Sequence, residues 1–208
     1  MSQARVPVGV LASGSGTNLQ ALLDAAATDD FPARIVVVGS DRPGALALQR
    51  AEGMGVPTFT VRRKGHASRE DFDAAVAHQL LAHGVRWVCL AGYMRIVGPT
   101  FLDAFEGRVL NIHPSLLPAF PGLDAQRQAF EHGVKVAGCT VHLVDAGTDT
   151  GPIVAQEAVP VLDGDDAEAL RLRILAAEHR IYPRALAWAV ADKLRIEGRK
   201  VRIDEEGR

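Results

Sequence analysis

Short runs of β-branched and other apolar residues alternate along the first half of the chain with segments of helical spacing, and this alternation most constrains the fold. Such alternation is typical of a parallel sheet joined by right-handed crossovers. The runs IVVVG and WVCLAG are apolar throughout, as expected for strands covered by helices on both faces. The sequence therefore predicts an α/β fold, with a doubly wound, mostly parallel sheet and helices on both faces. The expected strands are Val6–Ala12, Arg34–Gly39, Pro57–Val61, Trp87–Ala91 and Val109–Ile112.

Three intervening segments carry an apolar stripe and are expected to be helical. They lie within 19–26, 46–54 and 72–81. The third follows Ser68-x-x-Asp71, a pattern that predicts a capping box at the start of a helix.

The regular alternation of strand-like and helical segments stops after residue 114, which predicts a mixed C-terminal portion. A Pro- and Gly-rich loop leads to an expected helix at Ala125–His132, followed by strands at Thr140–Val144 and Ile153–Val161. A long helix is expected from about Asp165, broken or kinked near its middle at Pro183 because proline lacks the amide hydrogen. A last strand-like piece at 193–203 precedes the tail DEEGR, which is expected to fray.

The composition narrows the class of protein. A length of 208 residues suits one domain, and the balance of 23 basic against 25 acidic residues disfavours general nucleic-acid binding. No apolar run approaches the ~20 residues of a membrane span, and the N-terminus does not resemble a signal peptide. Cys89 and Cys139 each lie in an apolar run and are expected to be buried thiols. We therefore expect a cytoplasmic, single-domain enzyme.

A glycine loop follows the first expected strand. Gly14 and Gly16 stand just before a helix that should open near Thr17 and Asn18. The free N–H groups of a first helical turn favour an anion, and the spacing matches neither the dinucleotide fingerprint nor the lysine-bearing P-loop. A small phosphate monoester suits the loop, but so does a tight turn capped by Thr17 or Asn18, and the residues leave both open.

Asn111 and His113 stand two residues apart at the end of the fifth expected strand, so their side chains should share a face. Pro114 ends the strand there, at the carboxyl edge where open α/β sheets bind ligands. An amide beside an imidazole can stabilise an oxyanion and move a proton. A capping Asn with a hydrogen-bonded core His remains the alternative.

No residue stands out as a nucleophile or as part of a metal site. Ser115 lacks the G-x-S-x-G turn, the cysteines lie within strands, and the histidines show no metal-ligand spacing. The turn-rich connection after residue 144 contains Asp145 and Asp149. An aspartate there can orient an imidazole and stabilise its charged form, although most such aspartates only form turns.

Six motifs together resemble the folate-dependent formyltransferases, over about residues 6–190. The central one is Asn-Ile-His-Pro-Ser-Leu-Leu-Pro at 111–118, and the downstream one runs from Gly138 through Asp145 to Asp149-Thr-Gly-Pro. The other four are Ser-Gly-x-Gly-Thr-Asn-Leu-Gln, Ser68-Arg-Glu, Ala91-Gly-Tyr-Met-Arg-Ile and Glu178-His-x-Ile-Tyr-Pro. Their order is similar to that of the family members that formylate phosphoribosylglycinamide in purine synthesis. The family's His-x-His is absent, since Asp124 and Gln126 stand there.

The resemblance implies a role for each matching residue. Asn111, His113 and Asp149 would be catalytic. Phosphoribosylglycinamide would be bound through its phosphate by Gly16, Thr17 and Asn18, and through its glycinamide end by Glu178. The folate would be bound by Arg69, Met94, Arg95, Ile96, Val97, Asn111 and Val144. The implied single domain, 1–208, would have a phosphate-binding half over about 1–105, a folate and catalytic half over about 106–190, and a C-terminal strand and tail over 191–208.

The implied reaction is direct transfer of the formyl group from 10-formyltetrahydrofolate, the co-substrate, to the glycinamide amine. It needs no metal and no covalent enzyme intermediate. The implied partners are these two small molecules, with no nucleic acid or membrane, and the chain would be a monomer or homodimer. Three related alternatives are a methionyl-tRNA formyltransferase, a formyltetrahydrofolate deformylase and a sugar-nucleotide formyltransferase. The first two carry additional domains, and the third does not account for the Glu178 motif. A non-catalytic phosphate-binding module is the alternative from another class.

Overall fold

The computed structural model describes residues 4–204. The chain forms two compact units, one extending to Leu110 and one from Asn111 onward, and each is described by itself. The expectation of a single domain over 1–208, with its halves divided near residue 105, stays a prediction.

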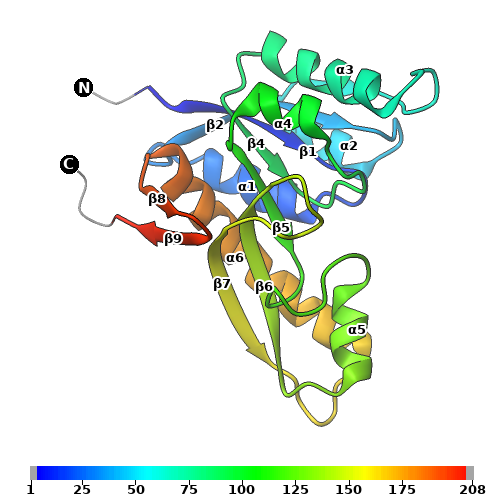
Figure 1. Ribbon diagram of the computed structural model, residues 1–208, viewed down its shortest axis with the longest axis vertical. Helices are drawn as coiled ribbons and strands as arrows, with labels where there is room; N and C mark the ends of the chain where they lie inside the picture. The colour runs from blue at the N-terminus through cyan, green and yellow to red at the C-terminus, as the bar shows by residue number, and fades with distance from the viewer. Residues whose placement is uncertain (1–3, 205–208) are drawn as a thin grey trace. The chain divides into compact units, whose positions relative to one another are not determined.

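The first unit is built on parallel strands, as predicted. Their order is β3-β2-β1-β4, and β1 pairs in parallel with both β2 and β4 (Figure 1). Val8, Val10, Val37 and Val38 are fully buried, so the middle strands are enclosed by the helices. The strands are β1 (Val6–Leu11), β2 (Ala33–Ser40), β3 (Thr58–Thr60) and β4 (Trp87–Leu90).

Three helices of this unit fall where the apolar stripes predict them, and a fourth was not predicted. The capping box of α3 is confirmed: Ser68 Oγ accepts from the N–H of Asp71, whose carboxylate accepts from the N–H of Ser68. The unpredicted helix begins at Pro99, and it packs on α3 (Figure 1). The helices are α1 (Thr17–Ala26), α2 (Leu46–Gly53), α3 (Arg69–Ala82) and α4 (Pro99–Phe105).

The second unit contains the mixed portion. Strand β5 (Val109–His113) begins in the first unit and ends in the second. Strands β6 (Val136–Leu143) and β7 (Ile153–Pro160) pair antiparallel, and β7 pairs in parallel with β9 (Lys200–Ile203). Helix α5 (Ala125–His132) matches the predicted range, and α6 (Ala167–Val190) packs along β6 and β7 (Figure 1).

Three details of the second unit differ from the sequence-based predictions. Helix α6 is not broken at Pro183, while a kink there stays a prediction. Ile181, Tyr182, Ala185 and Leu186 around the proline are fully buried, so packing holds the helix together. The expected strand at 193–203 is a hairpin of β8 (Leu194–Glu197) and β9, turned at Gly198. Strand β6 begins at Val136, four residues before the expected start. In the tail, residues 205–208 lie outside the described range.

Cys89 and Cys139 are buried free thiols, as predicted. None of the helices within the described residues combines the length and apolar character needed to cross a membrane.

Candidate active site

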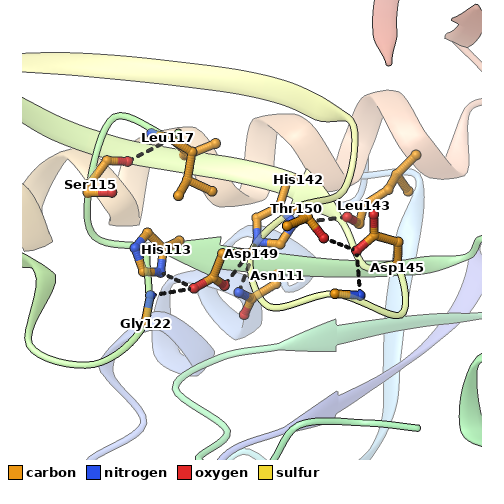
Figure 2. A network of polar contacts seen from close by, with 12 residues as sticks. Asn111, His113, Ser115, Leu117, Gly122, His142, Leu143, Asp145, Asp149 and Thr150 are labelled. Atoms are coloured by element: carbon orange, nitrogen blue, oxygen red, sulfur yellow. Dashed lines mark hydrogen bonds and ion pairs between the residues drawn. The ribbon is translucent and has the colours of Figure 1, made fainter. Parts of the chain in front are cut away.

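The predicted Asn–His pair lies at the end of β5. His113 is the last residue of the strand and is buried, while Asn111 is half-buried two residues earlier. Figure 2 shows both side chains in one polar network with His142, which lies on β6, and Asp149, which lies in the loop after β6. The pair therefore belongs to a group of four polar side chains within the second unit.

Both ring nitrogens of His113 face acceptors. Nε2 donates to the carbonyl of Phe120 at 2.9 Å, and Nδ1 lies 3.3 Å from the Asp149 carboxylate. A carbonyl can only accept, and a carboxylate favours a proton on the nitrogen that faces it. Each ring nitrogen of His113 therefore has an acceptor within reach.

Asp149 is held by the loop between β6 and β7. Its backbone adopts a left-handed conformation, with φ of 55°, which aspartate tolerates better than most residues. Asp145 organises this loop by accepting from the hydroxyl of Thr150 and the N–H of Gly147. A Cβ at Gly151 would stand 1.7 Å from the Leu143 carbonyl, so only glycine fits there. The two aspartates thus differ: Asp145 forms the turn, and Asp149 reaches His113 (Figure 2).

The surroundings of Asp149 favour its ionised form. Burial alone would raise the pKa of this carboxyl, but His142, the N–H of Gly122 at 2.9 Å and the charge of His113 hold the pKa below its ordinary value. Gly122 belongs to the segment that lacks the family's His-x-His, and this segment still supports Asp149 through its backbone.

Sequence reasoning missed His142. Its Nδ1 donates to the Leu143 carbonyl at 2.9 Å, so its Nε2 is free to accept from Asn111 Nδ2 at 3.1 Å. The same Nε2 lies 3.6 Å from Asp149, and the ring is buried (Figure 2). The sequence did offer a signal for His142. It stands two residues after Thr140 on the same expected strand, so both side chains should share a face, and the strand ends at a polar loop.

That no hydroxyl or thiol acts as a nucleophile stays a prediction, and the surroundings of Ser115 and Cys139 bear on it. Ser115 Oγ donates to the Ala119 carbonyl at 2.5 Å. Burial, followed by the charges of Glu178 and Glu157, raises the pKa of Cys139 to about 12, so its thiol stays protonated at neutral pH.

The glycine loop lies in the first unit. Gly16 is the N-cap of α1, with φ of 71° and no capping side chain, so neither Thr17 nor Asn18 caps the helix. A Cβ at Gly16 would approach the Ala47 backbone to 2.6 Å, and Arg50 Nε donates to the Ser15 carbonyl at 2.8 Å. Helix α2 thus holds the loop in shape.

The predicted folate-binding residues of the first unit lie together. Arg69 Nη2 donates to the Ile96 carbonyl at 2.8 Å, and Arg95 Nε donates to Asp41 at 2.7 Å. The apolar side chains of Met94 and Ile96 are 53% and 59% exposed, while Val97 is buried. Exposed apolar side chains on a tethered segment suit a planar aromatic ligand.

The remaining predicted residues lie in the second unit. Glu178 is a buried residue of α6, and its charge acts on Cys139. Val144 is half-buried and directly follows β6. Within residues 4–204, no three or more His, Cys, Asp or Glu side chains are grouped to hold a metal ion. That no metal takes part stays a prediction.

An amide, an imidazole and a carboxylate gathered where one strand of a parallel sheet ends are side chains that can stabilise an oxyanion and move a proton. The chain belongs to the formyl transferase family, whose sequence profile matches residues 6–186.

Proteins similar to this chain carry more specific names. It is 53% identical over 190 residues to a phosphoribosylglycinamide formyltransferase of Mycobacterium tuberculosis, covering 91% of this chain and 87% of that one. It is 50% identical over 192 residues to the trifunctional purine biosynthetic protein adenosine-3 of Drosophila melanogaster, covering 91% of this chain but only 14% of that much longer protein.

A solved structure shares the fold. The crystal structure of glycinamide ribonucleotide transformylase 1 from Symbiobacterium toebii superposes with a TM-score of 0.94 at 60% identity, covering 96% of this chain and 94% of the other. The predicted α/β fold class is therefore confirmed.

Proposed function

We propose that the chain transfers the formyl group of 10-formyltetrahydrofolate to the amine of phosphoribosylglycinamide, forming formylglycinamide ribonucleotide and tetrahydrofolate in purine biosynthesis. The observation that carries the proposal is the Asn111, His113 and Asp149 network, in a chain 53% identical to a protein named for this activity. The co-substrate is the folate, and no metal is proposed.

His113 is proposed to stabilise the oxyanion that forms when the amine attacks the formyl carbon. Its Nε2 donates to the Phe120 carbonyl, a neutral acceptor. A developing oxyanion is a stronger acceptor than a carbonyl, so it can take this place once substrate is bound. Asp149, 3.3 Å from Nδ1, stabilises the positive charge on the ring.

Asn111 is proposed to supply the second donor. One N–H of its amide is held by His142 at 3.1 Å, which leaves the other for the formyl oxygen. Collapse of the tetrahedral intermediate breaks the bond from the formyl carbon to N10. The proton lost by the attacking amine passes to N10 through His113, or through water held by Asp149.

Substrate binding is proposed to follow the family pattern. Gly16, Thr17 and Asn18 bind the phosphate through the N–H groups that open α1, and Glu178 binds the glycinamide end. Arg69 pairs with the glutamate carboxylate of the folate, and residues 94–97 with Asn111 and Val144 line the pterin pocket. We further propose that the protein acts in the cytoplasm as a monomer or homodimer, with no nucleic-acid or membrane partner.

An absorbance assay for tetrahydrofolate release tests the function. The protein receives a 10-formylfolate donor with and without phosphoribosylglycinamide, and we expect release only when both are present. Glycine in place of the ribonucleotide is the matched control, because it offers an amine without the phosphate. Release that does not depend on the acceptor would make water the acceptor and the protein a deformylase. No release with both substrates would refute the proposal.

A further inference from the structure

The segment 92–98, which joins β4 to α4, has no regular secondary structure but is hydrogen-bonded to its surroundings at several residues. At its start, the N–H of Ser13 donates to the Gly92 carbonyl at 3.1 Å, and the N–H of Met94 donates to Ser13 Oγ at 2.9 Å. Ser13 directly precedes the glycine loop. One serine thus fixes the entry to the segment through its backbone and its side chain.

Asp41 completes this attachment. It follows the last residue of β2, and its side chain is fully buried. One carboxylate oxygen accepts from Ser13 Oγ at 2.6 Å, and the other accepts from Arg95 Nε at 2.7 Å. A buried carboxylate therefore joins the end of β1, the end of β2 and the segment 92–98, with each oxygen bonded to a different partner.

The far end of the segment is attached to α3. Asp73, also buried, accepts from the N–H of Gly98 at 2.7 Å, and Arg69 holds the Ile96 carbonyl. Two buried carboxylates therefore fix the two ends. The exposed apolar side chains of Met94 and Ile96 are presented on a backbone that hydrogen bonds hold at Met94 and Gly98. Such preorganisation lowers the entropy cost of binding a ligand.

We propose that Asp41 is a positioning residue for the folate: through Ser13 and Arg95 it holds the segment 92–98 in the shape that binds the pterin. This inference rests on the proposed function. Asp41 is not proposed to contact the reacting atoms. In the proposed function, Asn111, His113 and Asp149 make those contacts. Loss of its charge should therefore weaken binding of the donor and leave the chemical step largely intact.

Steady-state kinetics of Asp41→Ala and Asp41→Asn test the proposal. Losing two charge-assisted hydrogen bonds in Asp41→Ala should raise KM for the 10-formyl donor about tenfold or more. We expect kcat and KM for phosphoribosylglycinamide to stay within about threefold, since a purely structural defect would change all three values. The donor KM of Asp41→Asn should lie between those of the unmutated protein and Asp41→Ala, because the amide oxygen of asparagine can accept from one of the two donors. Asp103→Ala, at an exposed aspartate of α4, is the matched control.

A double-mutant cycle with Arg95→Ala tests the route of the effect. If Asp41 acts through Arg95, the donor KM of the double variant should match that of the worse single variant. Fully additive effects, or a donor KM unchanged in Asp41→Ala, would overturn the proposal. Thermal unfolding checks each variant, and if Asp41→Ala does not fold, Asp41→Asn and Arg95→Ala are judged by the same donor KM. An unmutated protein that cannot use the donor would instead refute the proposed function.

Discussion

His113 is placed by two interactions and Asn111 by one, so replacing each residue alone tests its role separately. His113 lies between Phe120 and Asp149, and Asn111 is held by His142. Removing one donor to an oxyanion typically costs ~10²–10³ in rate. We expect His113→Ala and Asn111→Ala each to lower kcat by at least that order, measured at saturating substrates, while thermal unfolding shows a retained fold. Near-normal turnover in either variant would exclude the assigned role.

The proposed role of Asp149 differs from those of His113 and Asn111, because its carboxylate stabilises positive charge on the His113 ring. Asp149→Asn keeps the shape of the side chain and removes the carboxylate that faces His113. We expect a loss of kcat similar to that of His113→Ala, together with a displaced pH–rate profile. Asp145→Asn is the matched control, since that residue organises the same loop without contacting His113. An unchanged profile in Asp149→Asn would contradict the electrostatic role.

His142 is expected to act through Asn111, because its Nε2 accepts from the Asn111 amide. Residues that work as a unit show non-additive losses. We therefore expect His142→Ala to lower kcat, and His142→Ala with Asn111→Ala to be no slower than Asn111→Ala alone. Rates measured for the two single variants and the double variant decide this. A double variant slowed by the product of both factors would mean that His142 works independently of Asn111.

The site residues that could be predicted from the sequence have local signals beside them, and the ones that were missed do not. Asn111 and His113 stand out because two polar residues end an apolar strand beside a proline. His142 and Asp41 follow the same rule, as polar residues at or just after a strand end, but no adjacent motif marks them. Their importance lies in contacts with residues far along the chain, which spacing does not reveal.

At the scale of elements, the start of α3 should link stability to folate binding. The Ser68 side chain caps this helix, and Arg69, its first residue, holds the Ile96 carbonyl. Ser68→Ala should lower the free energy of unfolding by about 1 kcal/mol. It should also raise the donor KM, because Arg69 loses a fixed starting position.

A second capped helix provides the comparison. Asp166 caps α6 by accepting from the N–H of Ala169 at 2.7 Å. Asp166→Ala should cost a similar free energy in denaturant unfolding without changing the donor KM. Equal changes of donor KM in the two variants would show that the kinetic effect reports only stability.

The elements themselves were predictable where local signals and packing agree. The capping box and the apolar stripe place α3, and the alternation of apolar runs places β1, β2 and β4. Helix α4 was missed because seven residues give too short a stripe, although Pro99 is a typical first residue of a helix. Proline did not end α6 because buried neighbours on both sides of Pro183 keep the helix packed, and such tertiary packing outweighs local propensity.

At the scale of the whole molecule, the buried carboxylate of Asp73 and the half-buried carboxylate of Asp149 should respond to acid in opposite directions. The pKa of Asp149 is lowered in the folded state: burial acts to raise it, but the contacts with His142, Gly122 and His113 outweigh burial. Its stabilising contribution is therefore full above the unfolded-state value of about 3.9 and is lost as the pH falls through the lower native value. The pKa of Asp73 is raised, chiefly by burial, so its charged form costs stability at neutral pH, and acid relieves that cost.

Unfolding free energies measured in denaturant at about pH 6, 4 and 3 bracket this carboxylate range and separate the two contributions. On acidification, Asp149→Asn should lose less stability than the unmutated protein, because it has no carboxylate whose stabilising charge can be neutralised. Asp73→Asn should lose more, because it no longer gains from protonation, while its amide oxygen can still accept from Gly98. The exposed control Asp103→Asn should follow the unmutated protein. Parallel curves for all four proteins would show that neither carboxylate is coupled to folding as its surroundings require.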